Sequence, residues 1–592
     1  MEAAAAQANA WIKSLRLARV DGVTFRERFT YAGDSLWWFA ELYLHKERSV
    51  LSIFRTLAAA AAMFDREAPA SVRLTSRDPV AELVVRHLAH QRRVPYDGST
   101  PPPVPAHPLG MDLRSTALMA AAIASPARPI RQRPGRQPTV AAFVHRAFWQ
   151  GAASDGGAEA YIGPALRRLE HSLPARGVAY VGVGPASNFR ARRWWTRVAA
   201  TRPHVTPIEA LAPRSAMAGS LGLWAARHAM RRSLEQSPDL RAAAVVGGCD
   251  CWPVISRLLA GIALLQFPWS ARAMDEARAA LETCHASVAV TYAEAGGWGR
   301  AIALEARRVQ IPLVGLQHGF IYRHWLNYLH EPDEMAAHPR NAHDRGFPRP
   351  TSTLVFDAYA ARHLVGAGRF PSEAVTVTGS PRLDQLAARY RSLSEADVDA
   401  ARASAGVPLD AALLLLVTKY SEARGVLADL LDAVRGLPGV HLAIKAHPAE
   451  TPEPYVRAAV GAPRVRVLSP STDLAPLIRA SRAVVTVNST VALDAMTLGV
   501  PGLSIGLPNN LSPFVAAGAL AGARTRDEVA AMLRRLLYDE EFRQQLSAAS
   551  GAVCAEYRML PDGRAAGRQA AAILSLAAAR GEPRGRDSQD LI

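Results

Sequence analysis

The chain has 592 residues and a formal net charge of +17, from 69 Lys and Arg against 52 Asp and Glu. Its composition, 49% hydrophobic and 20% charged, can build more than one core, and no uninterrupted apolar run reaches the roughly 18 residues that span a bilayer. Four cysteines in a chain of this length exclude a disulfide framework. Because the N-terminal sequence also lacks the basic-then-apolar order of a secretory signal, we expect a soluble, cytoplasmic protein.

The positive charge favours anionic partners, which include nucleic acid, lipid headgroups and phosphorylated substrates. The sequence has neither zinc-finger spacing nor the aromatic pattern of an RNA-recognition motif, so no nucleic-acid partner is expected. The densest basic segment, 189–197, interleaves arginines with Trp194 and Trp195. This segment suits a membrane interface or an acidic acceptor, and it equally suits a structural helix with two core tryptophans.

Residues 1 to about 100 alternate strand-like segments, such as 71–75, with helix-like segments, such as 80–91. The run 101–108 is rich in proline, which fixes φ and removes a hydrogen-bond donor, and it predicts an extended linker. We therefore expect residues 1–130 to form an N-terminal α/β extension with a proline-rich linker.

A series of short apolar runs begins at residue 140, and each run precedes polar or glycine residues and then a helical pattern. Short continuous apolar strands that alternate with helices predict a parallel, doubly wound sheet. The predicted strands are 140–145, 179–183, 242–246, 288–292, 311–316, 352–356 and 374–378. They assign residues 131–400 to a first Rossmann-like domain.

A second series of the same kind predicts strands at 413–418, 441–446, 465–468, 484–487 and 502–505. It assigns residues 401–576 to a second Rossmann-like domain, and the polar sequence 577–592 to a disordered tail. Two such sheets in tandem form a cleft at the carboxyl ends of their strands, where open α/β sheets bind ligands. Candidate site residues should therefore lie directly after strands.

The most informative candidate follows strand 484–487, where Asn488, Ser489 and Thr490 precede a short helix. Hydroxyls and backbone N–H groups at a helix N-terminus favour an anion, so this turn predicts a phosphate cradle. Asp494 lies about one turn into the helix, where its carboxylate can accept hydrogen bonds from a ribose or sugar hydroxyl.

Basic side chains end the neighbouring strands of the second domain. Strand 441–446 leads to Lys445, His447 and Pro448, and the proline turns the chain out of the sheet where a ligand would lie. Lys419 follows strand 413–418 and adds positive charge at the same edge.

In the first domain, strand 311–316 ends at Gln317, His318 and Gly319. Glycine lets the backbone approach a ligand, and His318 can donate to a phosphate or transfer a proton near neutral pH. Strand 374–378 ends at a sharp turn with Gly379, and Arg382 either neutralises a phosphate or pairs with Asp384.

Two acidic residues follow strands of the first domain. Asp155, in a glycine-rich loop, is a candidate general base toward an acceptor hydroxyl, and a helix cap is an alternative of equal weight. Glu294 precedes several glycines and is a candidate substrate contact, although these glycines lack the full dinucleotide-binding pattern.

No metal site is expected. Cys249 and Cys251 have no second Cys or His pair at zinc spacing and predict buried thiols at a strand end. Asp397 and Asp399 fall at an ordinary helix start.

In order along the chain, QHG, TGSPRLD, IKAHP and NSTVALDAMTLGVP resemble bacterial GT-B enzymes of surface-polysaccharide assembly. This group includes capsule polysaccharide glycosyltransferases, CDP-glycerol glycerophosphotransferases, and bacterial sialyl- and polysialyltransferases, and the resemblance covers roughly residues 139–576. It implies that His447, Ser489 and Thr490 hold the donor phosphate. It also implies that Asp155, next to Gly156, supplies the base, although only one acidic residue precedes this glycine.

The UDP-N-acetylglucosamine 2-epimerases share the TG-x-P turn and the Gly-Val-Pro helix more distantly, and their acidic catalytic set has no clear counterpart in this chain. The resemblance thus implies a GT-B-like fold and a glycosyltransferase of surface or capsular polysaccharide biosynthesis. An epimerase-like enzyme and a non-catalytic scaffold of the same fold are the alternatives.

The implied catalytic residues are Asp155, His318 and His447. The donor would be CMP-, CDP- or UDP-linked, with cytidine slightly favoured, and the acceptor would be a glycan or a lipid-linked glycan. No cofactor and no metal are expected, because hydroxyls, helix N-termini and basic side chains can neutralise the leaving phosphate. We expect a cytoplasmic enzyme that attaches peripherally to the anionic inner face of the membrane.

Overall fold

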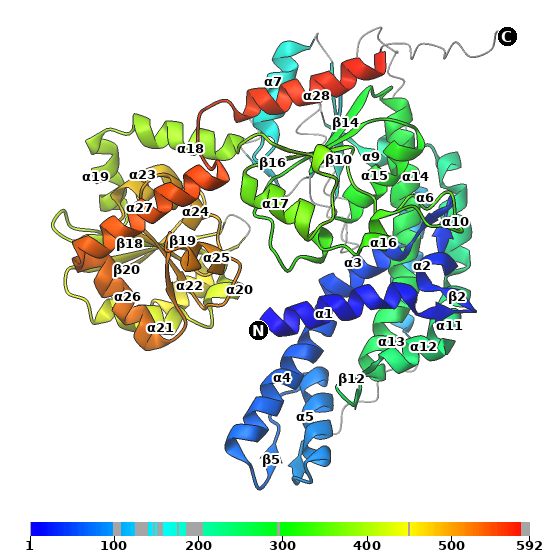
Figure 1. Cartoon of the computed structure of the whole chain (residues 1–592), viewed down its shortest axis with the longest axis horizontal. Coiled ribbons are helices and arrows are strands. Elements are labelled where there is room, and N and C mark those ends of the chain that lie inside the picture. Colours follow the sequence, from blue (N-terminus) through cyan, green and yellow to red (C-terminus); the bar gives the residue numbers. More distant parts are fainter. Residues whose placement is uncertain are drawn as a thin grey trace.

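The structure is a computed structural model that describes residues 2–98, 108–124, 140–145, 148–150, 158–173, 177–184, 205–292, 296–447 and 450–581. Two α/β lobes lie side by side, and the N-terminal helices pack on the first lobe (Figure 1). A helical arm extends from that lobe and consists of α4 (Ser49–Glu67) and α5 (Pro79–Gln91).

The first lobe is built on a seven-stranded parallel sheet with the order β11-β10-β7-β14-β15-β16-β17. Its strands are β7 (Val140–His145), β10 (Val178–Val183), β11 (Val205–Pro207), β14 (Val288–Tyr292), β15 (Leu313–Leu316), β16 (Ser352–Val355) and β17 (Val375–Val377). Alternate residues of β7 belong to two cores, since Phe143 and Val144 face opposite sides of the sheet. Helices cover both faces, which is why these strands are continuously apolar.

The helices of this lobe are α7 (Gly163–Ser172), α9 (Ile208–Leu211), α10 (Ala218–Ala225), α11 (Arg227–Gln236), α12 (Pro238–Ala243), α13 (Trp252–Gly261), α14 (Phe267–Thr283), α15 (Gly297–Arg308), α16 (Pro332–Met335) and α17 (Ala358–Gly366). A two-stranded pair, β8 (Trp149–Gln150) and β9 (Ala158–Glu159), lies outside the main sheet.

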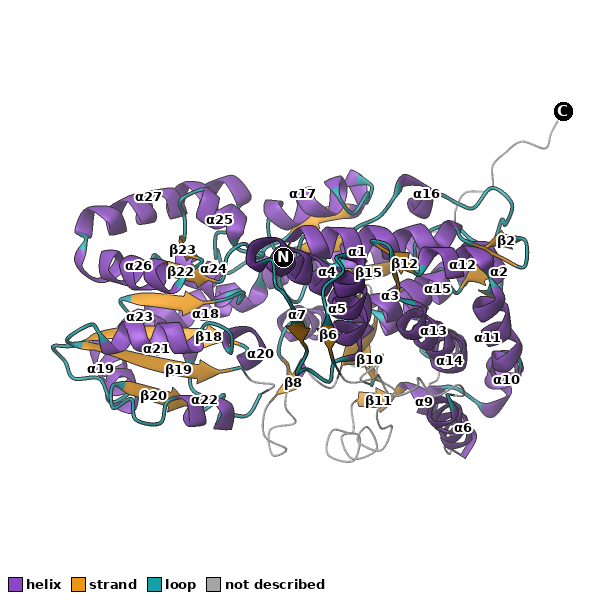
Figure 2. Ribbon diagram, turned by 90° about the horizontal axis from the view of Figure 1, so that it is seen from below, coloured by secondary structure: helices purple, strands orange, loops and turns teal. Residues whose placement is uncertain are grey.

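The second lobe is built on a six-stranded parallel sheet with the order β20-β19-β18-β21-β22-β23. Its strands are β18 (Ala412–Thr418), β19 (Val440–Ala446), β20 (Val465–Leu468), β21 (Ala483–Thr486), β22 (Gly502–Ile505) and β23 (Ala521–Ala523). Figure 2, seen from below, shows these strands side by side in the second lobe. If the strands of each sheet are numbered in chain order, the first six lie side by side in the order 3-2-1-4-5-6, which is the strand order of the Rossmann fold.

The helices of the second lobe are α18 (Pro381–Ser392), α19 (Glu395–Ser404), α20 (Tyr420–Ala423), α21 (Leu427–Arg435), α22 (Glu453–Ala458), α23 (Leu474–Ala480), α24 (Val491–Thr497), α25 (Ser512–Ala516), α26 (Arg526–Tyr538) and α27 (Glu540–Tyr557). A last helix, α28 (Ala565–Gly581), returns to the first lobe (Figure 1). Its Ile573 packs in the same core as Leu166 of α7 and Val144 of β7.

The two parallel sheets confirm the predicted α/β fold class, and every strand predicted for the two Rossmann-like domains except 242–246 belongs to one of them. That strand is wrong, because α12 continues to Ala243 and only β12 (Val245–Val246) is extended. β12 pairs antiparallel with β13 (Cys249–Asp250) around Gly247 and Gly248, whose φ values of +58° and +80° suit a two-residue hairpin turn. Cys249 and Cys251 are both buried.

The predicted N-terminal α/β extension is mainly helical. Its helices are α1 (Glu2–Ser14), α2 (Phe25–Arg28), α3 (Trp37–Glu47), α4, α5 and α6 (Leu109–Ala124). Its strands have two residues each and form the pairs β1–β2 (Arg19–Val20, Val23–Thr24), β3–β4 (Thr30–Tyr31, Asp34–Ser35) and β5–β6 (Val72–Arg73, Tyr96–Asp97). Phe25, Trp37 and Trp38 are fully buried in one core with Phe143 and Phe267, so these residues complete the first lobe.

One continuous helix, Trp252–Thr283, is long and apolar enough by length and composition to cross a membrane, and it is the one such helix in the described part of the chain. Its most apolar window has a mean hydropathy of 1.3, and 83% of that window is buried inside the protein. A π-helical turn, Ile262–Gln266, precedes Pro268, which cannot donate a backbone hydrogen bond. Many of its residues belong to the core that the first lobe shares with the N-terminal residues.

The chain crosses between the lobes twice, once after β17 and once between α27 and α28. After β17 it enters α18, whose Leu386 and Tyr390 pack against Leu477 and Ile478 of the second lobe. Residues 577–581, predicted as part of a disordered tail, belong to α28. The proline-rich run 101–107 and residues 582–592 lie outside the described part of the chain, so the linker and the rest of the tail stay predictions.

Candidate functional site

The carboxyl ends of both sheets meet at one cavity of about 600 Å³ between the lobes. All the predicted site residues that the structure describes line this cavity: Gln317, His318, Gly319, Gly379, Arg382, Lys419, Lys445, His447, Asn488, Ser489, Thr490 and Asp494. Asp155, Glu294 and Pro448 lie outside the described residues, so their roles stay predictions. The volume is within the ordinary range for a small-molecule site.

The second lobe brings cationic side chains to the cavity. Lys445 is buried, its Nζ donates to the carbonyl oxygen of Pro470 at 2.9 Å, and burial lowers its pKa. Burial, followed by the charge of Lys419, lowers the pKa of His447 below its ordinary value of 6.5. The imidazole is therefore mainly neutral at pH 7, and an anionic ligand beside it would favour its protonated form.

The turn before α24 is fixed by its own hydrogen bonds. Thr486 Oγ1 donates to the carbonyl oxygen of Val417 at 2.8 Å and accepts from the backbone N–H of Ser489 at 3.0 Å. Ser489 Oγ accepts from the N–H of Val491 at 3.3 Å, and Asn488 Oδ1 accepts from the N–H of Asn510 at 3.1 Å. These bonds hold the hydroxyl-bearing residues at the edge of the cavity.

Arg382 forms an ion pair with Asp494. The sequence left open a pair between Arg382 and Asp384, and that alternative is wrong. The Nη2 atom of Arg382 lies 2.6 Å from Oδ1 of Asp494, which joins α18 to α24. Asp384 instead accepts from the backbone N–H of Ala565 at the start of α28, at 2.9 Å. The Oδ2 atom of Asp494 is buried and has no hydrogen-bond partner among the described residues, so a ligand hydroxyl at this position would satisfy it.

The Gln317 amide binds within the protein at both ends. Its Nε2 donates to the carbonyl oxygen of Gly319 at 2.8 Å, and its Oε1 accepts from the N–H of Phe356 at 2.7 Å. Gln317 therefore supports the turn, while Gly319, where a Cβ would meet no atom within 4 Å, leaves room for a ligand.

Gly379 has a different reason to be glycine. Its φ is +88°, and a Cβ would lie 2.8 Å from Nη2 of Arg568 and 3.1 Å from the Cβ of Ala565. The residue is thus required by the return of α28 to the first lobe, in addition to lining the cavity.

His318 lies among aromatic rings, with ring centroids 5.0 Å from Phe148, 5.9 Å from Tyr161 and 5.1 Å from Tyr292. This wall was not predicted, although the sequence FIYRHWLNY after the QHG turn carries further aromatic residues. Phe320, Tyr322, Trp325 and Tyr328 from that sequence also line the cavity.

Glu159 was also missed, and it lies in the same segment as Asp155. Its Oε2 accepts from the N–H groups of Tyr161 at 2.9 Å and Gly163 at 2.6 Å, which caps α7. Tyr292 donates its hydroxyl to the other oxygen at 3.2 Å. Burial raises the pKa of Glu159 to about 7. The sequence signal for this cap is an acidic residue, Glu159, shortly before the Gly163-Pro164 helix start.

Two Rossmann-like sheets that face one cavity define a GT-B-like α/β protein. No family model matches the chain, and no curated protein matches it. The chain is similar to the structure of a putative UDP-N-acetylglucosamine 2-epimerase from Listeria monocytogenes, with 14% identity, a TM-score of 0.45 and coverage of 74% of this chain and 96% of that chain.

A similar match is the wall teichoic acid polymerase TagF in a structure soaked with CDPG, with 11% identity, a TM-score of 0.44 and coverage of 81% and 100% of the two chains. A glycosyltransferase from Rickettsia africae ESF-5 has 7% identity, a TM-score of 0.43 and coverage of 76% and 100%.

Proposed function

We propose that the protein is a metal-independent glycosyltransferase of surface or capsular polysaccharide biosynthesis. It would move a sugar, or a related group such as glycerol phosphate, from a nucleotide-linked donor to a glycan or lipid-linked acceptor. The observation that carries this proposal is the convergence of residues from the strand ends of both lobes on one cavity of about 600 Å³. A transferase needs such a cavity because donor and acceptor must meet at reacting distance.

The second-lobe side supports the donor assignment. Lys419 and Lys445 line the cavity at neighbouring strand ends and supply positive charge for a phosphate or diphosphate, and His447 beside them can donate a hydrogen bond to it. Fixed charges and hydrogen-bond donors of this kind stabilise a leaving phosphate without a metal. We therefore expect the activity to survive EDTA.

Asp494 supports a donor that carries hydroxyl groups. Its Oδ2 is buried beside the cavity and lacks a partner among the described residues, while Arg382 holds the other oxygen. A ribose or sugar hydroxyl that donates to Oδ2 would bind and be oriented at once. His318, on the opposite wall, would accept the proton of the acceptor hydroxyl, together with or instead of Asp155.

The first test is a thermal-shift screen with CMP-, CDP- and UDP-linked compounds, because a specific ligand raises the melting temperature by mass action. The second is His447→Ala, which should abolish turnover of the selected donor and leave the melting temperature unchanged. His441→Ala is the matched control, because His441 lies on the same strand and does not line the cavity.

Unchanged turnover in His447→Ala would refute the assignment. Incubation of the donor alone separates reaction classes, since an epimerase would change the sugar without an acceptor. If none of the compounds raises the melting temperature, the non-catalytic scaffold replaces the enzyme as the best explanation.

A further inference from the structure

The segment 323–334 connects the first-lobe wall of the cavity with the core. Two of its side chains, Trp325 and Tyr328, line the cavity. Its regular structure is limited to the 3-10 turn Leu326–Tyr328 and the first residues of α16. The conformation of this segment must therefore be fixed mainly by contacts with other elements.

Helix α1, from the N-terminal residues, lies along this segment. The Nδ2 atom of Asn9 donates to the carbonyl oxygen of His324 at 2.8 Å, and the carboxylate of Glu2 pairs with Arg323. Arg323 also donates to the carbonyl oxygen of Asn509 at 3.3 Å, so these contacts reach the second lobe.

Lys13 makes the most buried of these contacts. Its Nζ lies 2.7 Å from Glu41, 3.1 Å from Glu334 and 3.3 Å from Nδ1 of His330. An ammonium group has three N–H donors, and these three acceptors use all of them. Nε2 of His330 lies 3.1 Å from the carbonyl oxygen of Asn327, which fixes the tautomer with the proton on Nε2.

The charges of this cluster balance. Lys13 and Arg300 face the carboxylates of Glu41 and Glu334. The side chain of Lys13 is 6% exposed, and the other three are fully buried at 0%. Burial, with the charges of Lys13 and Arg300, keeps the pKa of His330 well below its ordinary value, so its ring is neutral. Removal of Lys13 alone would leave an unpaired negative charge in the core.

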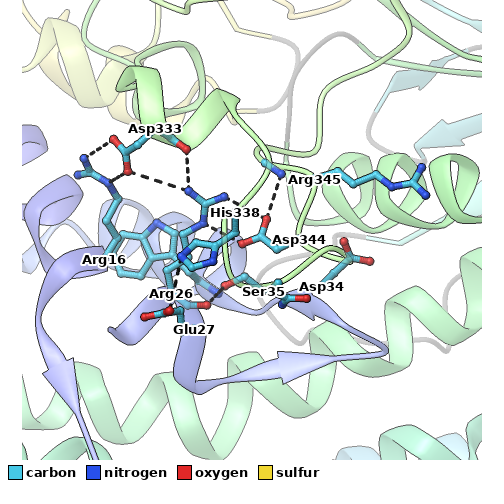
Figure 3. A network of polar contacts seen from close by, with 12 residues as sticks. Arg16, Arg26, Glu27, Asp34, Ser35, Asp333, His338, Asp344 and Arg345 are labelled. Carbon is cyan, nitrogen blue, oxygen red and sulfur yellow. Dashed lines mark hydrogen bonds and ion pairs between the residues drawn. The ribbon is translucent and has the colours of Figure 1, made fainter. Parts of the chain in front are cut away.

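A second, less buried contact lies at the next turn of the chain. The guanidinium of Arg16 binds Asp333 in a bidentate pair at 2.7 and 2.8 Å (Figure 3). Arg26 pairs with Asp344 at 2.8 Å and donates to the backbone carbonyl of Asp333 at 2.8 Å. The N-terminal residues thus hold both ends of the 323–334 segment.

We infer that Lys13 and Arg16 are positioning residues that hold the 323–334 segment in place, so that α1 is part of the machinery that shapes the ligand cavity. The role is indirect, since neither residue lines the cavity. The ligand-binding arm of its test rests on the proposed function, whereas the exchange arm does not.

The test compares Lys13→Met, the charge-balanced Lys13→Met/Glu334→Gln and the control Lys46→Met, which removes an exposed lysine. Amide hydrogen exchange is followed in peptides from 319–335 and from β18. Because the double variant leaves Arg300 paired with Glu41, it should melt near the wild-type temperature. Its 319–335 amides should exchange roughly tenfold faster or more, since a hydrogen bond to a charged group is lost, while β18 and Lys46→Met stay unchanged.

The binding arm measures the dissociation constants of CDP and UDP. We expect an increase of roughly tenfold in the double variant and in Arg16→Met, with Arg28→Met as control because Arg28 pairs with Asp21 within the N-terminal residues. Unchanged exchange in 319–335, or unchanged nucleotide affinity in a double variant with faster exchange, would overturn the inference. If neither nucleotide binds the wild type, the proposed function fails and the exchange result alone decides.

Discussion

Asp494→Asn tests whether the buried carboxylate beside the cavity serves a ligand. The substitution removes the charge that faces Arg382 at 2.6 Å and replaces one acceptor oxygen by an N–H₂ donor. The side chain of Asp494 is 6% exposed and that of Arg382 is 30% exposed. Breaking a fully buried pair costs about 3–5 kcal/mol, and because water reaches Arg382 we expect a loss of about 2 kcal/mol in the free energy of unfolding.

The effect on ligand binding should be separate and comparable in size. A hydrogen bond from a ligand hydroxyl to a charged carboxylate contributes about 1.5–3 kcal/mol, so the affinity for a nucleotide-linked donor should fall by roughly ten- to a hundredfold. Isothermal titration calorimetry measures this affinity, and urea denaturation measures the free energy of unfolding.

Asp432→Asn is the matched control, because Asp432 pairs with Arg526 at 2.7 Å in the same lobe and does not line the cavity. A normal donor affinity in Asp494→Asn, together with a lowered free energy of unfolding, would show that the carboxylate only joins α18 to α24. An unchanged free energy of unfolding would contradict the magnitude assigned to the ion pair.

Three further predictions concern pH, packing and location. The pKa of Glu159 is about 7 in the fold against 4.5 ordinarily, so the protonated side chain stabilises the fold at low pH, and this stabilisation is lost as the pH rises through 7. Glu159→Gln should therefore gain up to about 3 kcal/mol of stability relative to the wild type between melts at about pH 5 and pH 8. A difference that does not depend on pH would contradict this prediction. Gly379→Ala should lower the free energy of unfolding, measured in urea, by about 2 kcal/mol or more. The control Gly406→Ala, where φ is also positive but a Cβ meets no atom within 4 Å, should lower it by about 1 kcal/mol. Equal losses in the two variants would argue against the contact of Gly379 with α28. The protein should sediment with anionic vesicles at low salt and be released at high salt. The basic segment 189–197 lies outside the described residues, and replacement of Arg192, Arg193, Trp194 and Trp195 in it should weaken vesicle binding, so unaltered binding in that variant would reject this patch.

The sequence was sufficient for the fold class and for the polar residues that line the cavity at the strand ends, because parallel topology links the two. Gln317, His447 and Ser489 each follow an apolar strand, and the carboxyl ends of parallel strands meet at one edge of a sheet. The strand predicted at 242–246 failed because its apolar run contains the end of a helix and half of a two-residue hairpin. β23 was not predicted, because its sequence Ala-Gly-Ala lacks the β-branched residues that favour strands.

Contacts between residues distant in the chain lay beyond the sequence. The Arg382–Asp494 pair spans 112 positions and the Lys13–Glu334 pair 321, so both depend on how lobes and helices pack. One usable signal was present: the chain has only four lysines among its 69 Lys and Arg. Two of them, Lys419 and Lys445, line the cavity, a third, Lys13, is buried, and the fourth, Lys46, is exposed, so three of the four lysines in this arginine-rich chain occupy positions that the structure singles out.

The double crossing of the chain between the lobes has a mechanical consequence. Two covalent connections, one between β17 and α18 and one between α27 and α28, join the same pair of bodies. Two bodies tied at two points can rotate about the line through those points, but they are restrained from sliding or twisting apart. Any opening of the cavity should therefore be a hinge motion about the two connections, which come together where Gly379 lies against Ala565 and Arg568 of α28. A single proteolytic cut at either connection would leave the lobes attached by the other.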